Sequence, residues 1–180
     1  LRAGITHLWF VTLHPFDDGN GRITRTLTDL SLAQMDEQSI RLYAMSTAIL
    51  NKRKSYYEIL EQTQKNDSDI TDWLVWFLDT LNDSLEKTLA QISRTLFKSQ
   101  FWHKYSNLAL SEEQRKVLNR LLDGGENGFE HGISASQYQK VAKTSKATAT
   151  RHLSDLLEKK CIVKLEGGGR NTRYQINTQL

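Results

Sequence analysis

Residues 1–35 read LRAGITHLWFVTLHPFDDGNGRITRTLTDLSLAQM and decide how the first half of the chain folds. Pro15 disfavours helical backbone at the residue before it, so we expect a first helix to end at His14. The turn-rich DDGNG follows, and a helical period resumes at about Gly21. The side chains expected to line the inner faces recur every three or four residues and are Ile5, Leu8, Trp9, Thr12, Leu13, Ile23, Leu27, Leu30 and Ala33. Two helices joined by a tight loop are therefore predicted.

Helical periodicity continues through the rest of the first half. One helix is predicted over residues 39–64 and another over residues 69–96, where Asp69 or Asp72 is a suitable N-cap. The aromatic residues Trp73, Trp76 and Phe77 follow helical spacing, which is typical of a core stripe. The first half is thus expected to be all α.

The last third changes character. Ser111, followed by two glutamates and a glutamine, predicts a capped helix that runs to about Leu122 and ends at GGENG. Helices are expected in SASQYQKVAKT (134–144) and SKATATRHLSDLLEKK (145–160), then strands in CIVKL (161–165) and RYQIN (173–177) around a glycine-rich tip. Three helices and a hairpin in this order are typical of a winged helix-turn-helix. We predict a mainly α protein with domains at 1–105 and 106–180.

Composition limits the function classes. The chain has 180 residues, of which 38% are hydrophobic and 25% charged, as in ordinary globular domains. The uncharged run around ITHLWFVTLHPF is shorter than the roughly 20 residues of a membrane span, and no signal peptide is recognisable. Cys161 is the single cysteine, which fits a reducing cytoplasm. Because the sequence opens within a helical pattern and without methionine, we expect it to be truncated at its N-terminus.

The loop at residues 14–20 begins with residues suited to acid–base and metal chemistry. His14 stands at a helix end, and imidazole is the side chain that exchanges a proton near neutral pH. Asp17 and Asp18 supply the hard oxygen ligands that Mg²⁺ prefers. A base and a metal ligand are therefore expected side by side.

The second part of the loop is suited to an anion. Gly19 and Gly21 let the backbone approach a ligand closely, and the N-terminus of the following helix attracts negative charge. Arg22 and Arg25 lie three residues apart on its first turn, so both guanidinium groups can reach phosphate oxygens. Together with the base and metal ligand, this is a phosphoryl-transfer pattern.

Residues 14–25, HPFDDGNGRITR, resemble the signature HPFx(D/E)GNGRxxR of the Fic family at every fixed position. The resemblance implies that His14 takes the proton of a target hydroxyl and that Asp18 holds Mg²⁺ against the phosphates of ATP. It also implies that Phe16 packs the loop into the core. The remaining nucleotide-binding residues that it implies are Gly19, Asn20 and Gly21 at the anion hole, and Arg22 and Arg25 at the distal phosphates.

Members of the family mostly transfer AMP from ATP to a Ser, Thr or Tyr hydroxyl of a protein. Other stretches, such as YYEILEQTQ and DITDWLVWFL, resemble bacterial Fic proteins with a C-terminal winged helix. Such proteins carry a target-aligning flap, and often an inhibitory helix, ahead of the motif. Neither stands in this sequence, so we expect the chain by itself to be weakly active or inactive. Removal of AMP from a target and nucleotide sensing by a DNA-binding regulator stay open as alternatives.

Several residues have a structural interpretation beside a functional one. His7 shares a face with apolar residues, which favours a satisfied core or rim histidine over a catalytic one. Tyr56 and Tyr57 suit the edge of an adenine pocket, although packing is the more common role. The histidines His103, His131 and His152 lack the spacing of a zinc site.

Residues 140–173 are rich in lysine and arginine, as a DNA phosphate backbone would require. In the helix expected from residue 145, small polar side chains lead and an apolar stripe of Leu153, Leu156 and Leu157 follows. The DNA-contact candidates are Ser145, Lys146, Thr148, Thr150 and Arg151 on that helix and Arg170 and Arg173 on the hairpin. Docking of another protein is the alternative for this module. The expected partners are therefore ATP, an unknown target protein and DNA, with a homodimer left open and no membrane.

Overall fold

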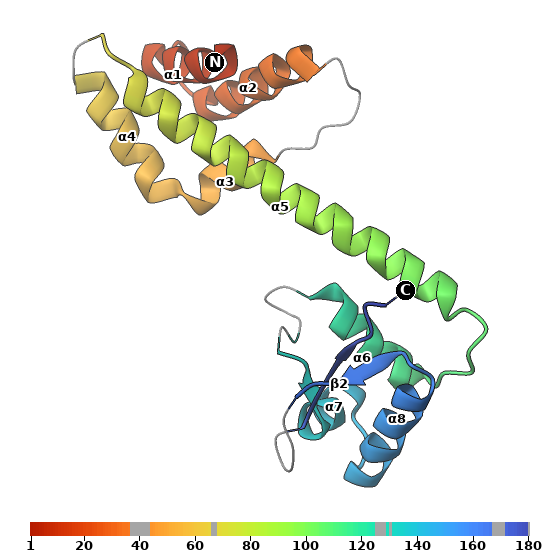
Figure 1. Ribbon diagram of the computed structural model, residues 1–180. Helices are drawn as coiled ribbons and strands as arrows, with labels where there is room; N and C mark the ends of the chain where they lie inside the picture. Colours follow the sequence, from red (N-terminus) through yellow and green to blue (C-terminus); the bar gives the residue numbers. More distant parts are fainter. Residues whose placement is uncertain (37–43, 66–67, 125–128, 130, 167–171, 180) are drawn as a thin grey trace. The chain divides into compact units, whose positions relative to one another are not determined.

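The computed structural model describes residues 1–36, 44–65, 68–124, 129, 131–166 and 172–179 (Figure 1). Its contacts divide the chain into two units, Leu1–Gln91 and Ile92–Leu180, which we describe one at a time. The division falls within helix α5 (Thr71–Lys104), whereas the boundary predicted after residue 105 follows the end of that helix. In its described ranges the chain is mainly helical with one small antiparallel sheet, and no helix there is long and apolar enough to cross a membrane.

The first unit begins with the predicted pair of helices. Helix α1 (Arg2–Leu13) ends at the expected position, and α2 (Asn20–Asp36) starts one residue before the expected Gly21. The two helices pack along each other (Figure 1). The first turns of α1 also contact α5, where the indole Nε1 of Trp73 donates to the carbonyl oxygen of Gly4 at 2.9 Å.

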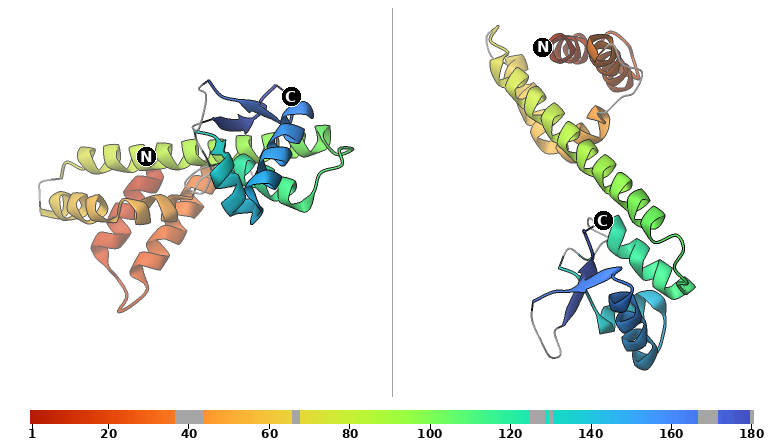
Figure 2. Two further views of the ribbon diagram at one scale, coloured as in Figure 1. Left: turned by 90° about the horizontal axis from the view of Figure 1, so that it is seen from below. Right: turned by 45° about the vertical axis from the view of Figure 1, so that its right-hand side comes forward.

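The helix expected over residues 39–64 is divided in the structure. Its described part forms α3 (Met45–Asn51) and α4 (Arg53–Lys65), separated at Lys52, and residues 39–43 lie outside the described ranges. Helix α4 lies beside the N-terminal turns of α5 (Figure 2), where the indole Nε1 of Trp76 donates to Ser55 Oγ at 3.1 Å. Asp69, one of the two predicted caps, accepts from the backbone N–H of Thr71 at 2.8 Å.

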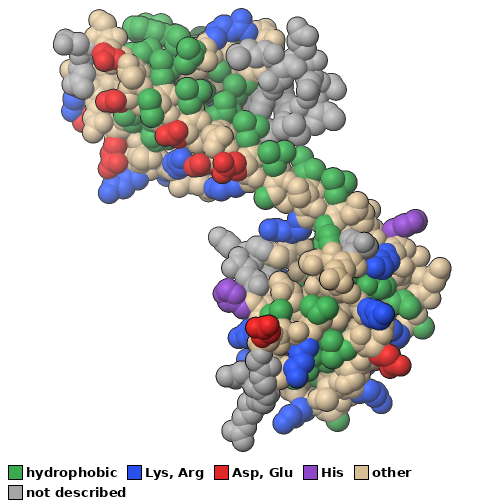
Figure 3. Space-filling model, viewed as in Figure 1, with side chains coloured by type: hydrophobic (Ala, Val, Ile, Leu, Met, Phe, Trp, Pro, Cys, Tyr) green, Lys and Arg blue, Asp and Glu red, His purple; other side chains and the backbone are tan. Residues whose placement is uncertain are grey.

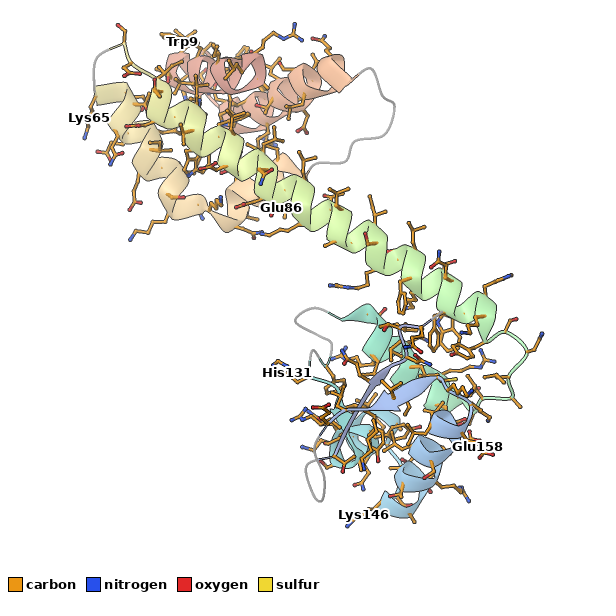
Figure 4. All side chains as sticks on the ribbon, in the orientation of Figure 1. Trp9, Lys65, Glu86, His131, Lys146 and Glu158 are labelled. Carbon is orange, nitrogen blue, oxygen red and sulfur yellow. The ribbon has the colours of Figure 1, made fainter. Side chains whose placement is uncertain are left out.

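The inner faces of α1 and α2 differ from those predicted. On α1 the buried residues are Ala3, Gly4, His7 and Leu8, and the predicted Ile5, Trp9 and Leu13 are exposed. Figure 4 labels Trp9, and Figure 3 shows hydrophobic side chains on the surface of this unit. On α2 Leu30 is 48% exposed, while Thr24, Thr28, Ser31 and Leu32 are buried. Burying the threonines costs little because their hydroxyls donate to helix carbonyls, Thr24 to Asn20 and Thr28 to Thr24. The buried faces of α1 and α2 thus contain many small side chains, and several larger apolar side chains lie outside.

The second unit contains the predicted helices and hairpin. Helices α6 (Glu112–Asp123) and α7 (Ala135–Ala142) both start with a capping box, at Ser111 and Ser134, and α8 (Lys146–Glu158) is capped by Ser145. Strands β2 (Ile162–Lys164) and β3 (Arg173–Ile176) pair antiparallel, as expected. A strand that the sequence analysis did not predict, β1 (Ile133–Ser134), pairs with the other side of β3, which gives the order β1-β3-β2.

The core of the second unit draws on all its elements. The sheet contacts α6 and α8 (Figure 2), and the predicted stripe of α8 is buried at Leu153 and Leu156. The end of α5 supplies Phe101, which is fully buried there. Gly132, just before β1, has φ +74, and a Cβ at this position would lie 2.7 Å from the carbonyl oxygen of Tyr174. Only glycine therefore lets β1 approach β3 so closely.

Candidate nucleotide site

His14 lies directly after the last residue of α1, where it forms the C-cap. Its backbone is left-handed, with φ 45 and ψ 54, and its N–H donates to the carbonyl oxygen of Phe10 at 3.2 Å. Histidine is among the residues that adopt this conformation most readily after glycine. The side chain is exposed to solvent. The helix end thus turns the imidazole out of the fold, where a substrate can reach it.

Asn20 closes the loop from the inside. Its side chain is 2% exposed, accepts from the backbone N–H of Phe16 at 3.0 Å through Oδ1, and donates through Nδ2 to the carbonyl oxygen of the same residue. Both polar ends of the amide are therefore used to hold the backbone at position 16. The sequence analysis assigned Asn20 to the anion hole, and in the structure its side chain is a clamp that shapes the loop.

Phe16 does not pack the loop into the core, contrary to the expectation. Its side chain is 52% exposed, and its ring centroid lies 6.3 Å from that of Phe10. Because Asn20 holds the loop through the backbone of Phe16, the loop keeps its shape without burying the ring.

The N-terminus of α2 faces the loop. Gly19, with φ +84, accepts from the N–H groups of Arg22 and Ile23, both at 3.0 Å, so the N–H groups of Asn20 and Gly21 precede the first bonds of the helix. Such leading N–H groups, at the positive end of the helix dipole, attract anions. If an anion binds at residues 19–21, as predicted, backbone N–H groups are therefore the groups that would hold it.

Charged side chains surround this helix end. Asp18 Oδ1 accepts from the N–H of Gly19 at 2.6 Å, and its Oδ2 lies 3.3 Å from Arg22 Nη2. The Arg22–Asp18 pair is exposed, so it contributes little to stability and can open. Arg25 is held by a bond from its Nε to the carbonyl oxygen of Gly21 at 3.0 Å. Within the described ranges, no three His, Cys, Asp or Glu side chains form a group that could hold a metal ion by themselves.

Two adjoining hollows contain the loop residues. The smaller, of about 270 Å³, is lined by residues 17–22 with His14 and Arg25. The larger, of about 410 Å³, is a cleft that adds side chains from α1, α3 and α4. His14, Gly21 and Arg25 line both hollows. The cleft residues contributed by α1, α3 and α4 are His7, Val11, Ser46, Ile49, Leu50, Arg53, Tyr56 and Tyr57.

A buried polar chain forms one wall of the cleft. His7 is 1% exposed, its Nδ1 lies 2.9 Å from Thr28 Oγ1, and its Nε2 lies 3.0 Å from Tyr56 Oη. Burial, with a smaller contribution from the positive charge of Arg25, lowers the pKa of His7 to about 4. Burial also raises the pKa of Tyr56 to about 12. Near neutral pH, His7 is therefore uncharged and Tyr56 keeps its proton. The burial of His7 and the contacts of both its ring nitrogens confirm it as a satisfied core histidine.

Tyr57 lies beside this wall and is more exposed. Its ring centroid is 5.2 Å from that of Tyr56, and the guanidinium carbon of Arg53 lies 5.8 Å from the Tyr57 centroid. The cleft thus offers an aromatic face next to apolar side chains of α1 and α3, and the two tyrosines singled out in the sequence both line it.

Residues 1–32 match the model of the Fic/DOC family. The Fic/DOC match covers α1, the loop and most of α2, and so contains every loop residue that the sequence analysis named. Helices α3 and α4, which complete the cleft, lie outside the matched residues.

The sequence analysis missed two contributors to this site, Thr28 and Arg53. Thr28 sits four residues after Thr24 on the buried face of α2, a polar pair that hydropathy periodicity places on the outside. Arg53 stands between two lysines in the sequence, a pattern typical of a solvated helix face, and only the turn between α3 and α4 brings it to the cleft.

Most of the DNA-contact candidates lie on α8 or at its N-cap (Figure 4, where Lys146 and Glu158 mark the ends of the helix). Lys146, Thr150 and Arg151 are exposed, whereas Ser145 Oγ accepts from the backbone N–H of Thr148 as the N-cap. On β3, Arg173 Nη1 donates to the carbonyl oxygen of Gly132 at 3.0 Å. The other hairpin candidate, Arg170, lies outside the described residues.

Proposed function

We propose that the first unit carries the site of a protein adenylyltransferase, which moves AMP from ATP to a Ser, Thr or Tyr hydroxyl of a protein. The observation that carries this proposal is the pair of adjoining hollows sharing His14, Gly21 and Arg25. A candidate base therefore stands between an anion site and a cleft of nucleotide size. The Fic/DOC match over the same loop supports this choice of reaction.

The phosphates of ATP would lie in the smaller hollow. There the N–H groups of Asn20 and Gly21 point at them from the start of α2, and Arg22 and Arg25 supply two positive charges. Arg22 would leave its exposed contact with Asp18, because a phosphate with more charge competes for the guanidinium.

The adenine and ribose would lie in the larger cleft. Its volume of about 410 Å³ is within the usual range of small-molecule sites, roughly 300–1,000 Å³. Val11, Ile49 and Leu50 supply apolar walls, and the ring of Tyr57 supplies an aromatic surface for a flat base.

In the reaction, His14 accepts the proton of the target hydroxyl. The hydroxyl oxygen then forms a bond to the α-phosphorus, the bond from that phosphorus to the bridging oxygen breaks, and pyrophosphate leaves with the electron pair. Backbone N–H groups at the start of α2, together with Arg25 and the released Arg22, stabilise the charge that develops on the phosphates. The carboxylate of Asp18 would hold Mg²⁺, and it fits because it is exposed and Mg²⁺ sites commonly combine one or two carboxylates with phosphates and water. When bound, Mg²⁺ neutralises phosphate charge.

The test is an incubation of the chain with ATP labelled on its α-phosphate and Mg²⁺, alone and with added cell lysate. We expect weak labelling of protein that is lost in His14→Ala, while ATP binding, measured separately, is retained. His131→Ala is the matched control, because His131 is an exposed histidine of the second unit. Full labelling by His14→Ala would refute the assignment of the base. Release of AMP from an adenylylated protein, without forward labelling, would favour the reverse reaction.

The second unit supports a second candidate function, DNA binding. The described elements run α6, β1, α7, α8, β2 and β3, the order of a winged helix-turn-helix, and lysine and arginine outnumber acidic side chains on the face shown in Figure 3. The capped start of α8 presents Lys146, Thr150 and Arg151 to solvent, as a recognition helix would.

This candidate is tested by fluorescence anisotropy with a labelled DNA duplex at several salt concentrations. Each phosphate contact contributes about −0.9 to the slope of log K against log salt, so Lys146→Ala with Arg151→Ala should flatten the slope by about 2. Lys116→Ala, on the exposed side of α6, is the matched control. Binding that does not change with salt would count against DNA as the partner.

A further inference from the structure

The wall of the cleft contains a chain of three hydrogen bonds whose donors can be assigned. Thr28 Oγ1 lies 2.8 Å from the carbonyl oxygen of Thr24, which can only accept, so the single hydroxyl proton of Thr28 serves this bond. Thr28 Oγ1 must then accept from Nδ1 of His7 at 2.9 Å. A neutral imidazole carries one N–H, so Nε2 is left as an acceptor.

Tyr56 completes the chain. With Nε2 of His7 as acceptor, the hydroxyl of Tyr56 donates its proton inward across the 3.0 Å contact. The opposite imidazole tautomer would forfeit the bond between Thr28 and Thr24, so the assigned tautomer satisfies one hydrogen bond more in a buried place. The oxygen of Tyr56 therefore has only lone pairs left for other partners.

The Tyr56 oxygen that carries these lone pairs lies at the wall of the cleft. His7 and Tyr56 both line it, so the bond between them forms part of its wall. Among the side chains that the structure describes, His7 is the hydrogen-bond partner of Tyr56 Oη. A ligand in the cleft thus meets an oxygen that can accept a hydrogen bond and cannot donate one.

We propose that Tyr56 determines which base this site accepts: its Oη takes a hydrogen bond from an N–H donor on the base, which in ATP is the exocyclic amine of adenine. This inference rests on the proposed nucleotide site and adds its base specificity. His7 and Thr28 are positioning residues, because they act only by fixing the direction of the Tyr56 hydroxyl.

The experiment compares two nucleotides that differ at one group. ATP and purine riboside triphosphate, in which hydrogen replaces the amine, are titrated calorimetrically against the chain in the presence of Mg²⁺. One hydrogen bond corresponds to roughly 2- to 10-fold in affinity, so ATP should bind tighter by that factor. In Tyr56→Phe the affinity for ATP should fall by the same factor and that for purine riboside triphosphate should stay, which brings their ratio to about one.

Tyr57→Phe is the matched control, because it removes the neighbouring hydroxyl while the bond to His7 belongs to Tyr56. The ratio should persist in this variant. Circular dichroism checks the folding of both variants. The ratio of the affinities for ATP and purine riboside triphosphate in the unaltered chain tests the inference without any variant.

The outcomes separate the inference from the proposed function. Equal affinities for the two nucleotides in the unaltered chain, or a ratio that persists in Tyr56→Phe, would overturn the inference and leave the nucleotide site standing. The inference would also be overturned if Tyr56→Phe removed the difference between ATP and 2′-deoxy-ATP instead, since the donor would then be the ribose. If none of these nucleotides bound, the nucleotide site itself would be refuted, and the inference with it.

Discussion

Acidification should destabilise the first unit through His7. The pKa of His7 in the folded protein is lowered from 6.5 to about 4 by burial and by Arg25, so between these pH values the unfolded chain binds the proton and the folded chain does not. The free energy of unfolding therefore decreases as the pH falls below 6.5, and the loss is complete below about 4. The gap of about 2.5 pH units, at about 1.36 kcal/mol each, amounts to about 3 kcal/mol.

Urea unfolding at pH 7 and pH 5 measures this loss. At pH 5 about 2 kcal/mol of it should already be present. A Trp102→Phe background removes the tryptophan of the second unit, so that emission reports on Trp9, Trp73 and Trp76. Carboxylates also titrate in this range, and the comparison with His7→Gln, which cannot take up the proton, isolates the contribution of His7.

We expect His7→Gln to be less stable than the unaltered chain at pH 7 and to lose about 2 kcal/mol less on going to pH 5. His131→Gln, at an exposed position, should behave like the unaltered chain. If His7→Gln and the unaltered chain lost stability in parallel, His7 would not be held neutral by burial, and the assignment of the Tyr56 hydroxyl would lose its basis.

Two further predictions concern packing and the loop. Gly4→Ala should destabilise the first unit by about 1–3 kcal/mol in urea unfolding, because the new Cβ would lie 3.1 Å from Phe77 Cδ1. Gly21→Ala is the control and should not destabilise it, because the space around Gly21 is open. Equal stability of these two variants would show that the contact between α1 and α5 can accommodate an added methyl group. Asn20→Ala should remove both bonds to the backbone of Phe16, cost about 1–3 kcal/mol and weaken ATP binding, while Asp17→Ala on the same loop should keep the stability. Unchanged ATP binding in a folded Asn20→Ala would mean that the loop does not need this clamp.

Local signals predicted most of the element boundaries. Pro15 stops α1 at His14, Ser111 and Ser145 cap α6 and α8, and the glycine-rich segment separates β2 from β3. These features depend on the backbone preferences of a few neighbouring residues, so a single sequence contains them. Strand β1 has two residues and exists only because β3 offers it a partner, which no local pattern indicates.

Inner and outer faces were harder to predict. Periodicity placed Trp9 and Leu30 inside, yet Trp9 is 53% exposed and Leu30 is 48% exposed. Thr28, by contrast, is buried. Hydropathy ranks threonine as polar, but a hydroxyl that donates to its own helix carbonyl can be buried at little cost. The choice of face depends on which partner helix is present and how closely it approaches, as at Gly4.

The sequence by itself determined which side chains the loop carries: the residues from His14 to Arg25 place a histidine, acidic side chains, a helix N-terminus and two arginines within twelve positions. Tertiary structure alone decided which side chains face the loop across the cleft. Tyr56 reaches His7 across 49 positions of the chain, and Arg53 joins the cleft because the helices part at Lys52. The physical reason is that loop chemistry follows from bonded neighbours, whereas the cleft and the direction of its hydroxyl follow from side chains that packing brings together from distant helices.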